Sequence, residues 1–74
     1  MNNKLAKIAA EIFFLDEEEV QPELTPDDVA LWDSLNHLRL ITAVEVEFGV
    51  KFSMNDIQSI DSISRLNDLI EAQA

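Results

Sequence analysis

Cysteine and tyrosine are absent from this sequence, and histidine and glycine occur only once each. Without cysteine, the chain cannot form a disulfide, a thiolate zinc site or a thiol nucleophile. One histidine is too few for a histidine-based zinc centre, and the acidic residues do not form the Asp-x-Asp-x-Asp-Gly pattern of a calcium loop. We therefore expect no metal site.

Basic residues are also scarce: five lysines and arginines face fifteen acids, which gives a net charge of −10. Nucleic acids and anionic membranes repel such a chain, so we expect neither as a partner. The charge instead favours partner proteins with basic docking surfaces, although it could equally serve only to keep a small protein soluble.

Long hydrophobic runs are missing as well, since no apolar stretch approaches the roughly 18 residues of a membrane span. The N-terminal segment has an amphipathic pattern and does not look like a signal peptide. We therefore predict a cytoplasmic protein without membrane insertion, and we expect a free-standing monomer formed by one domain over residues 1–74.

Hydrophobic residues nevertheless make up 47% of the chain, and they recur with the period of a helix. Helices are predicted over residues 3–15 and 34–48, and over a last segment that begins at Asp61 or Ser62. Ser53 opens a short helix through a capping box. No stretch alternates with period two for long enough to predict a strand. The expected fold is all-α, a small four-helix bundle of three main helices and one short helix.

The first two main helices are expected to bury defined sides. Asn2 or Asn3 can cap the first, and of the adjacent Phe13 and Phe14 one should reach the core and the other its edge. The second helix should end at Gly49, a C-cap glycine. Its broad buried face is predicted to comprise Leu35, Leu38, Leu40, Ile41, Val44 and Phe48.

A long acidic loop over residues 16–33 is predicted between the first and second helices. Pro22 and Pro26 prevent a continuous helix there. Thr25 and the residues that follow it carry the signal of a single helical turn. Scattered apolar residues should fasten this loop to the bundle, namely Val20, Leu24, Val29 and Leu31. A loop this long usually has a functional or packing reason.

The most informative string is Trp32-Asp33-Ser34-Leu35, where the loop gives way to the second helix. It places the Ser34 hydroxyl at a helix N-terminus, whose unpaired amides and partial positive charge favour a phosphate. The alternative is that Asp33 or Ser34 is only an N-cap. The residues on both sides of the string decide between these interpretations.

The string from Asp33 to Gly49, an Asp-Ser-Leu followed by an acid-bearing apolar helix that ends in Glu-Phe-Gly, resembles the second helix of acyl carrier proteins. The segments around Phe52, Ile57 and Ile60–Ile70 also resemble that family, and so do the first helix and acidic loop. The resemblance therefore covers nearly the whole chain.

This resemblance implies that Ser34, flanked by Asp33 and Leu35, carries 4′-phosphopantetheine delivered from coenzyme A by a phosphopantetheinyl transferase. The thiol of that arm would hold acyl groups as thioesters, so the chain itself would not be an enzyme. Its further partners would be an acyl-loading ligase or transferase and the synthase enzymes of fatty-acid, polyketide or related biosynthesis. Residues expected to line the acyl chain are Leu40, Val44, Ile57 and Ile60, although core packing alone also explains them.

The sequence departs from typical fatty-acid carriers on the recognition side of the second helix. Asn36, Arg39 and Val46 stand at positions that are commonly acidic, whereas Glu45 and Glu47 remain. Asn36, Arg39, Glu45 and Glu47 are therefore the candidate partner-recognition residues. A cation on a docking face repels a basic partner, which favours a specialised carrier; alternatively, Arg39 pairs with an acid of its own chain.

Two aromatic residues near Ser34 have more than one interpretation. Trp32 could shield the root of the arm, form a partner hot spot, or pack the loop onto the bundle, and we favour packing. His37 lies three residues after Ser34, but no orienting acid or oxyanion loop accompanies it, so a hydrolytic pair is not expected. We predict that His37 is a surface residue beside the arm.

Two rival functions stay open at this point. One is an acidic helical adaptor that keeps the fold without a prosthetic group, and the other is an aminoacyl or peptidyl carrier. The intact Ser34 favours a carrier, because an adaptor has no need of it.

Overall fold

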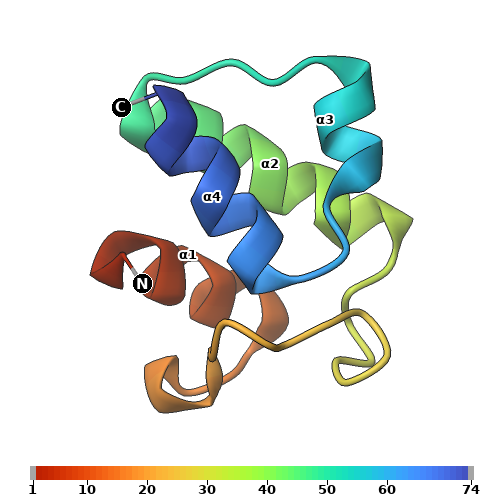
Figure 1. The fold of residues 1–74 in the computed structure, drawn as a ribbon. Helices are drawn as coiled ribbons and strands as arrows, with labels where there is room; N and C mark the ends of the chain where they lie inside the picture. The colour runs from red at the N-terminus through yellow and green to blue at the C-terminus, as the bar shows by residue number, and fades with distance from the viewer. Residues whose placement is uncertain (1, 74) are drawn as a thin grey trace.

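The computed structural model of the chain describes residues 2–73, so Met1 and Ala74, the ends of the predicted domain, lie outside the described residues. Its elements, in chain order, are α1 (Asn3–Phe13), the 3₁₀ turn η1 (Glu17–Glu19), α2 (Ser34–Phe48), α3 (Met54–Ser59) and α4 (Ile63–Gln73). Between residues 2 and 73 there is no strand, so the predicted all-α bundle is confirmed (Figure 1). No helix in this part of the chain is long and apolar enough to cross a membrane.

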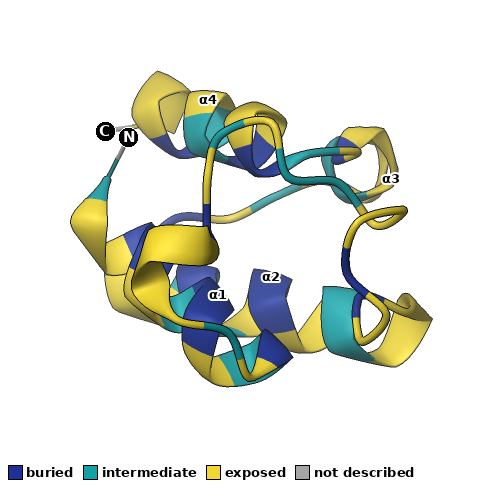
Figure 2. Ribbon diagram, turned by 90° about the horizontal axis from the view of Figure 1, so that it is seen from below, coloured by how far each residue is buried: buried dark blue, intermediate teal, exposed yellow. Residues whose placement is uncertain are grey.

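The helices form two layers around one core. Figure 2 shows α4 lying over α1 and α2, with buried residues in the space between these layers and exposed residues on the outer sides. The side chains that are most completely buried come from all three long helices and from the loop: Phe13, Leu5, Leu40, Ile63, Leu66, Val20 and Val44. The core is therefore built by residues far apart in sequence.

The ends of α1 and α2 follow the same rules of backbone hydrogen bonding. Asn2 caps α1, as its side chain accepts hydrogen bonds from the amides of Lys4 and Leu5. At the end of α2, Gly49 adopts a left-handed conformation with φ 66°, and its amide donates to the Glu45 carbonyl. The predicted C-cap glycine is confirmed, and it allows the chain to leave α2 without strain.

The end of α1 differs from the prediction. The helix ends at Phe13 rather than at residue 15, and Phe14 takes the left-handed conformation with φ 56°. Phe13 is buried, but the expectation that Phe14 lies at the edge of the core is wrong, since it is 85% exposed. The left-handed residue reverses the chain so that the Leu15 amide returns to the Ala10 carbonyl at 3.0 Å, which turns the Phe14 ring outward.

The long loop is fastened to α4 through its backbone. The Ile63 amide donates to the Leu24 carbonyl at 3.0 Å, and the Ser64 amide donates to the Pro22 carbonyl at 2.7 Å. These are amides of the first turn of α4, which have no acceptor within the helix. The acidic loop therefore supplies acceptors that the start of α4 needs, which is a packing reason for its length.

The apolar residues of this loop divide into buried and exposed ones. Val20 and Val29 are buried and Leu24 is half-buried, as predicted, whereas Leu31 is 40% exposed, so its predicted packing is wrong. The predicted turn at Thr25 forms, because the Asp28 amide donates to the Thr25 carbonyl at 2.9 Å.

The predicted buried face of α2 is too broad. Leu40, Ile41 and Val44 are buried, but Leu35 and Leu38 are 58% and 53% exposed. At about 100° per residue, Leu35 and Leu38 lie on the side of the helix away from Leu40 and Val44. Apolar residues occupy both sides of α2, and only one side meets the rest of the bundle.

The two left-handed helix ends give opposite predictions for substitution. Gly49→Ala should lower the free energy of unfolding by about 1 kcal/mol, because alanine is strained at φ 66° although no atom would touch its Cβ. Phe14→Gly should raise it by up to about 1 kcal/mol, because a strained and exposed side chain is removed. Urea denaturation of both variants would test this, and shifts of the same sign would contradict it.

Candidate functional site

Ser34 is the first residue of α2, immediately after the cap of that helix. Asp33 is the N-cap: its backbone is extended, and its carboxylate accepts a hydrogen bond from the Asn36 amide at 2.8 Å. Ser34 itself is exposed, and among residues 2–73 its hydroxyl has no hydrogen-bond partner. The sequence alone allows Asp33 or Ser34 to be the N-cap of α2, and in the structure the N-cap is Asp33. The Ser34 oxygen is therefore available for modification.

The backbone around Ser34 is suited to a negatively charged group. The amides of Ser34 and Leu35 precede the first hydrogen bond inside α2, and they find no acceptor in the described part of the chain. Such free amides carry the positive end of the helix dipole, and α2 is fifteen residues long. A phosphate attached to the Ser34 oxygen would therefore lie beside two hydrogen-bond donors.

Asn36 fixes the approach of the loop to this position. Its side-chain amide donates to the Leu31 carbonyl at 2.7 Å, while its own backbone amide is bonded to Asp33. These two bonds hold the residues just before Ser34 against the first turn of α2. Asn36, a predicted partner-recognition residue, thus has a positioning contact inside its own chain.

Trp32 and His37 form a bridge from the loop to α3, which we call the Trp–His bridge. The indole Nε1–H of Trp32 donates to Nδ1 of His37 at 2.9 Å, and Nε2 of His37 lies 3.0 Å from the Ile57 carbonyl oxygen. Because the indole nitrogen can only donate, Nδ1 accepts and the ring proton lies on Nε2, which donates to Ile57. One imidazole therefore joins three segments.

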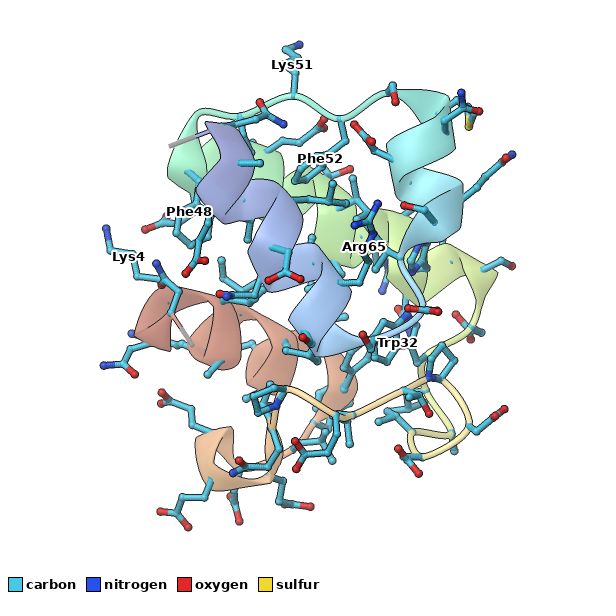
Figure 3. The ribbon with its side chains drawn as sticks, in the orientation of Figure 1. Lys4, Trp32, Phe48, Lys51, Phe52 and Arg65 are labelled. Atoms are coloured by element: carbon cyan, nitrogen blue, oxygen red, sulfur yellow. The ribbon has the colours of Figure 1, made fainter. Side chains whose placement is uncertain are left out.

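The bridge decides between the interpretations of these two side chains. Trp32 is buried and stacks on Phe13 with ring centroids 5.1 Å apart, so the packing interpretation is confirmed and an exposed hot spot is excluded. Figure 3 labels Trp32 where the loop meets the helices. The expectation that His37 is a surface residue is wrong, because its ring is half-buried and both nitrogens are engaged. Neither nitrogen is free to act as a base on Ser34.

Beside Ser34 lies an open hollow of about 430 Å³, which we call the serine hollow. Its lining comes from the loop, α2 and α3: Pro26, Trp32, Asp33, Ser34, His37, Leu38, Met54, Ile57, Gln58 and Ile60. Of the four predicted acyl-lining residues, Ile57 and Ile60 belong to it. Leu40 and Val44 do not, because they are completely buried in the core.

The sequence offers no signal for several residues of this hollow. Pro26, Met54 and Gln58 reach it only because the loop and α3 converge on the start of α2. Ser34 and Gln58 are far apart in the sequence, and only the tertiary packing brings them to the same hollow. Periodicity and capping patterns describe single helices and cannot reveal such convergence.

A second Asp-Ser pair offers an internal comparison. Asp61-Ser62 precedes α4 as Asp33-Ser34 begins α2. However, the Ser62 oxygen accepts a hydrogen bond from the Arg65 amide at 3.1 Å, so this serine is itself the cap. The amides of the following turn are also bonded to the loop, and Ser62 therefore lacks both features that distinguish Ser34.

The remaining predicted recognition residues lie farther along α2. Glu45 is half-buried and accepts a hydrogen bond from the Phe52 amide at 2.9 Å, which holds the loop after the helix. Glu47 lies 3.8 Å from the Lys4 ammonium in an exposed pair of small energetic weight. Arg39 is exposed and forms no ion pair within residues 2–73, so the alternative that it is neutralised by its own chain is not supported.

Exposed apolar side chains surround Arg39. Leu35, Leu38 and Val46 follow one another along the outer side of α2, and Val46 is 80% exposed. Together with Ile8 of α1 they line a shallow hollow that also includes Arg39 and Glu47. Contiguous exposed apolar surface of this kind marks interaction sites in many proteins.

Two comparisons with known proteins match most of the chain. A sequence profile described as "Phosphopantetheine attachment site" matches residues 3–70. The fold is similar to the solution NMR structure of a holo acyl carrier protein from Geobacter metallireducens, with a TM-score of 0.84 and 30% sequence identity. That match covers 93% of this chain and 79% of the other.

Removal of the Asp33 cap should destabilise the helix that presents Ser34. Asp33→Ala is expected to lower the free energy of unfolding by about 1 kcal/mol, because the Asn36 amide loses its acceptor. Asp27→Ala removes the same charge from an exposed loop residue that has no side-chain hydrogen bond within residues 2–73, and it should have little effect. Equal losses measured by urea denaturation would contradict the capping role.

Proposed function

Because the chain belongs to the phosphopantetheine attachment site family, we propose that Ser34 is the residue that carries the 4′-phosphopantetheine arm of this carrier protein. The observation that carries the proposal is the exposed hydroxyl of Ser34 beside the amides of Ser34 and Leu35, none of which has a hydrogen-bond partner within residues 2–73. Ser62 occupies a similar sequence context, but its oxygen is used as a helix cap.

The residues around Ser34 fit the arm chemically. The amides of Ser34 and Leu35 can donate to the phosphate oxygens, while Asp33 keeps the first turn of α2 in place. On attachment, the Ser34 oxygen forms a bond to the phosphorus that bears the pantetheine, a P–O bond of the coenzyme A pyrophosphate breaks, and adenosine 3′,5′-bisphosphate leaves. The serine proton passes to the transferase. The arm supplies a thiol that holds acyl groups as thioesters, and this chain contributes attachment, orientation and presentation.

Carrier proteins of this family are not enzymes, so the chemistry of loading and extension belongs to the partners. The proposed partners are a phosphopantetheinyl transferase, an acyl-loading ligase or transferase, and downstream synthase enzymes. The net charge of −10 supports partners with basic docking surfaces, because opposite charge accelerates encounter. We propose that these encounters take place in the cytoplasm.

The residues on the outer side of α2 support the proposal that this protein is a specialised carrier rather than a carrier of general fatty-acid synthesis. Arg39 carries a positive charge there that has no ion-pair partner in the described part of the chain, and its neighbours Leu35, Leu38 and Val46 are exposed and apolar. A basic partner surface that suits an acidic helix would meet repulsion at Arg39. The cation therefore discriminates against some partners as well as favouring others.

Attachment of the arm is the direct test of Ser34. After incubation with coenzyme A, magnesium and a broad-specificity phosphopantetheinyl transferase, the intact mass should increase by one arm. Ser34→Ala should keep the fold, because Asp33 rather than Ser34 caps α2, yet it should gain no mass. Ser62→Ala is the matched control and should be loaded completely. Loading of Ser34→Ala, or loss of loading in Ser62→Ala with its fold intact, would contradict the assignment.

Charge reversal at Arg39 tests the specialised-carrier proposal. Arg39→Glu should increase kcat/KM with enzymes of general fatty-acid synthesis several-fold at low salt, and the gain should shrink as salt screens the contact. Arg65→Glu makes the same charge change at an exposed position of α4 and should leave these rates nearly unchanged. Equal responses of both variants would show that only net charge matters, and no response of Arg39→Glu would place residue 39 outside the docking face.

A further inference from the structure

The serine hollow is open toward solvent and closed toward the core. Leu38 and Met54 lie at exposed positions of its lining, whereas Trp32 and Ile60 are buried. The lining is mostly apolar, and its polar members are Asp33, Ser34, Gln58 and the His37 ring. An apolar group that enters beside Ser34 therefore finds favourable contacts at the surface before it reaches the interior.

The inner end of the hollow is closed by the Trp–His bridge. His37 projects from α2, and its Nε2 is bonded to the Ile57 carbonyl at the end of α3, so the imidazole spans the gap between the two helices. Trp32 holds the other ring nitrogen and stacks on Phe13 of α1. A chain passing between α2 and α3 would have to displace this imidazole and break both of its hydrogen bonds.

Beyond the bridge lie buried residues of the core. Leu40 and Val44 are completely buried, as is Phe13, against which Trp32 packs. On α2, Leu40 and Val44 lie on the same side of the helix as His37 but farther along its axis from Ser34. To admit a long chain, the core would have to expand as well as lose the bridge.

We propose that His37 is a specificity-determining residue that keeps the cargo outside the bundle, so that this carrier presents short acyl groups in the serine hollow and does not enclose long ones. The proposal rests on the attachment of the arm to Ser34. A short acyl group contacts Met54 and Ile57 at the surface of the hollow and reaches the buried Ile60 beneath them. A longer chain extends past the hollow into solvent or onto the partner enzyme.

A chain-length series in the unaltered protein tests this directly. The protein, labelled with ¹³C in the methyl groups of isoleucine, leucine and valine, is loaded from butyryl-, octanoyl- or dodecanoyl-coenzyme A by a broad-specificity transferase. The Ile57 and Ile60 methyl resonances should shift with the butyryl group and change little with longer chains. The Leu40 and Val44 resonances should stay in place throughout. Progressive shifts of Leu40 and Val44 from butyryl to dodecanoyl would overturn the proposal.

The role of His37 itself is tested by removal of the bridge. With the dodecanoyl group, His37→Ala should shift the Leu40 and Val44 methyl resonances that stay in place in the unaltered protein. Gln58→Ala, which changes the lining without touching the bridge, should behave like the unaltered protein. If the His37→Ala protein folds and its Leu40 and Val44 resonances do not shift with the dodecanoyl chain, the proposed role of His37 in excluding the chain is overturned. If that variant does not fold, Trp32→Phe removes the indole donor to His37 while it keeps an aromatic ring beside Phe13, and it is subject to the same two outcomes.

Failure of this proposal is distinguishable from failure of the proposed function. Intact mass establishes first whether Ser34 carries the acyl-bearing arm. A protein that gains no arm refutes the attachment site, whereas a protein that gains the arm and draws dodecanoyl into its core refutes only the role of His37.

Discussion

The position of the Trp32 indole is the constraint on which the arrangement around Ser34 depends. It stacks on Phe13 from α1 and donates a hydrogen bond to His37 of α2, which in turn bonds to the last turn of α3 through Ile57. The buried ring thus fixes the end of a long loop against three helices. Since Ser34 follows Trp32 by only two residues, the loop cannot move without moving Ser34, the proposed attachment residue.

Local patterns predicted most of the helix ends and the position of Ser34. Caps, prolines and the single glycine act within a few residues, so their effects can be inferred without the tertiary structure. Asn2, Ser53 and Gly49 all behave as these patterns predict. The start of α2 at Ser34 was predicted in the same way, because a helix start is a local feature. The role of Ser34 as attachment residue stays a prediction.

The burial of several side chains was predicted less well, because it depends on contacts between helices that are far apart in the sequence. Apolar residues lie on both sides of α2, and periodicity does not say which side meets α1 and α4, so Leu35 and Leu38 were assigned to the core. His37 was expected at the surface because its two partners, the Trp32 indole and the Ile57 carbonyl, come together only in the folded bundle. Phe14 was misplaced because its left-handed backbone is unusual for a phenylalanine.

The Trp–His bridge also gives the molecule an optical property of its own. Trp32 is the sole tryptophan and tyrosine is absent, so the near-ultraviolet emission of the protein arises almost entirely from this one indole. That indole packs between Phe13 and His37, two residues before the proposed attachment serine. Its fluorescence therefore reports on the closure of the bundle, and a carrier in use could be followed by its intrinsic emission without any added dye.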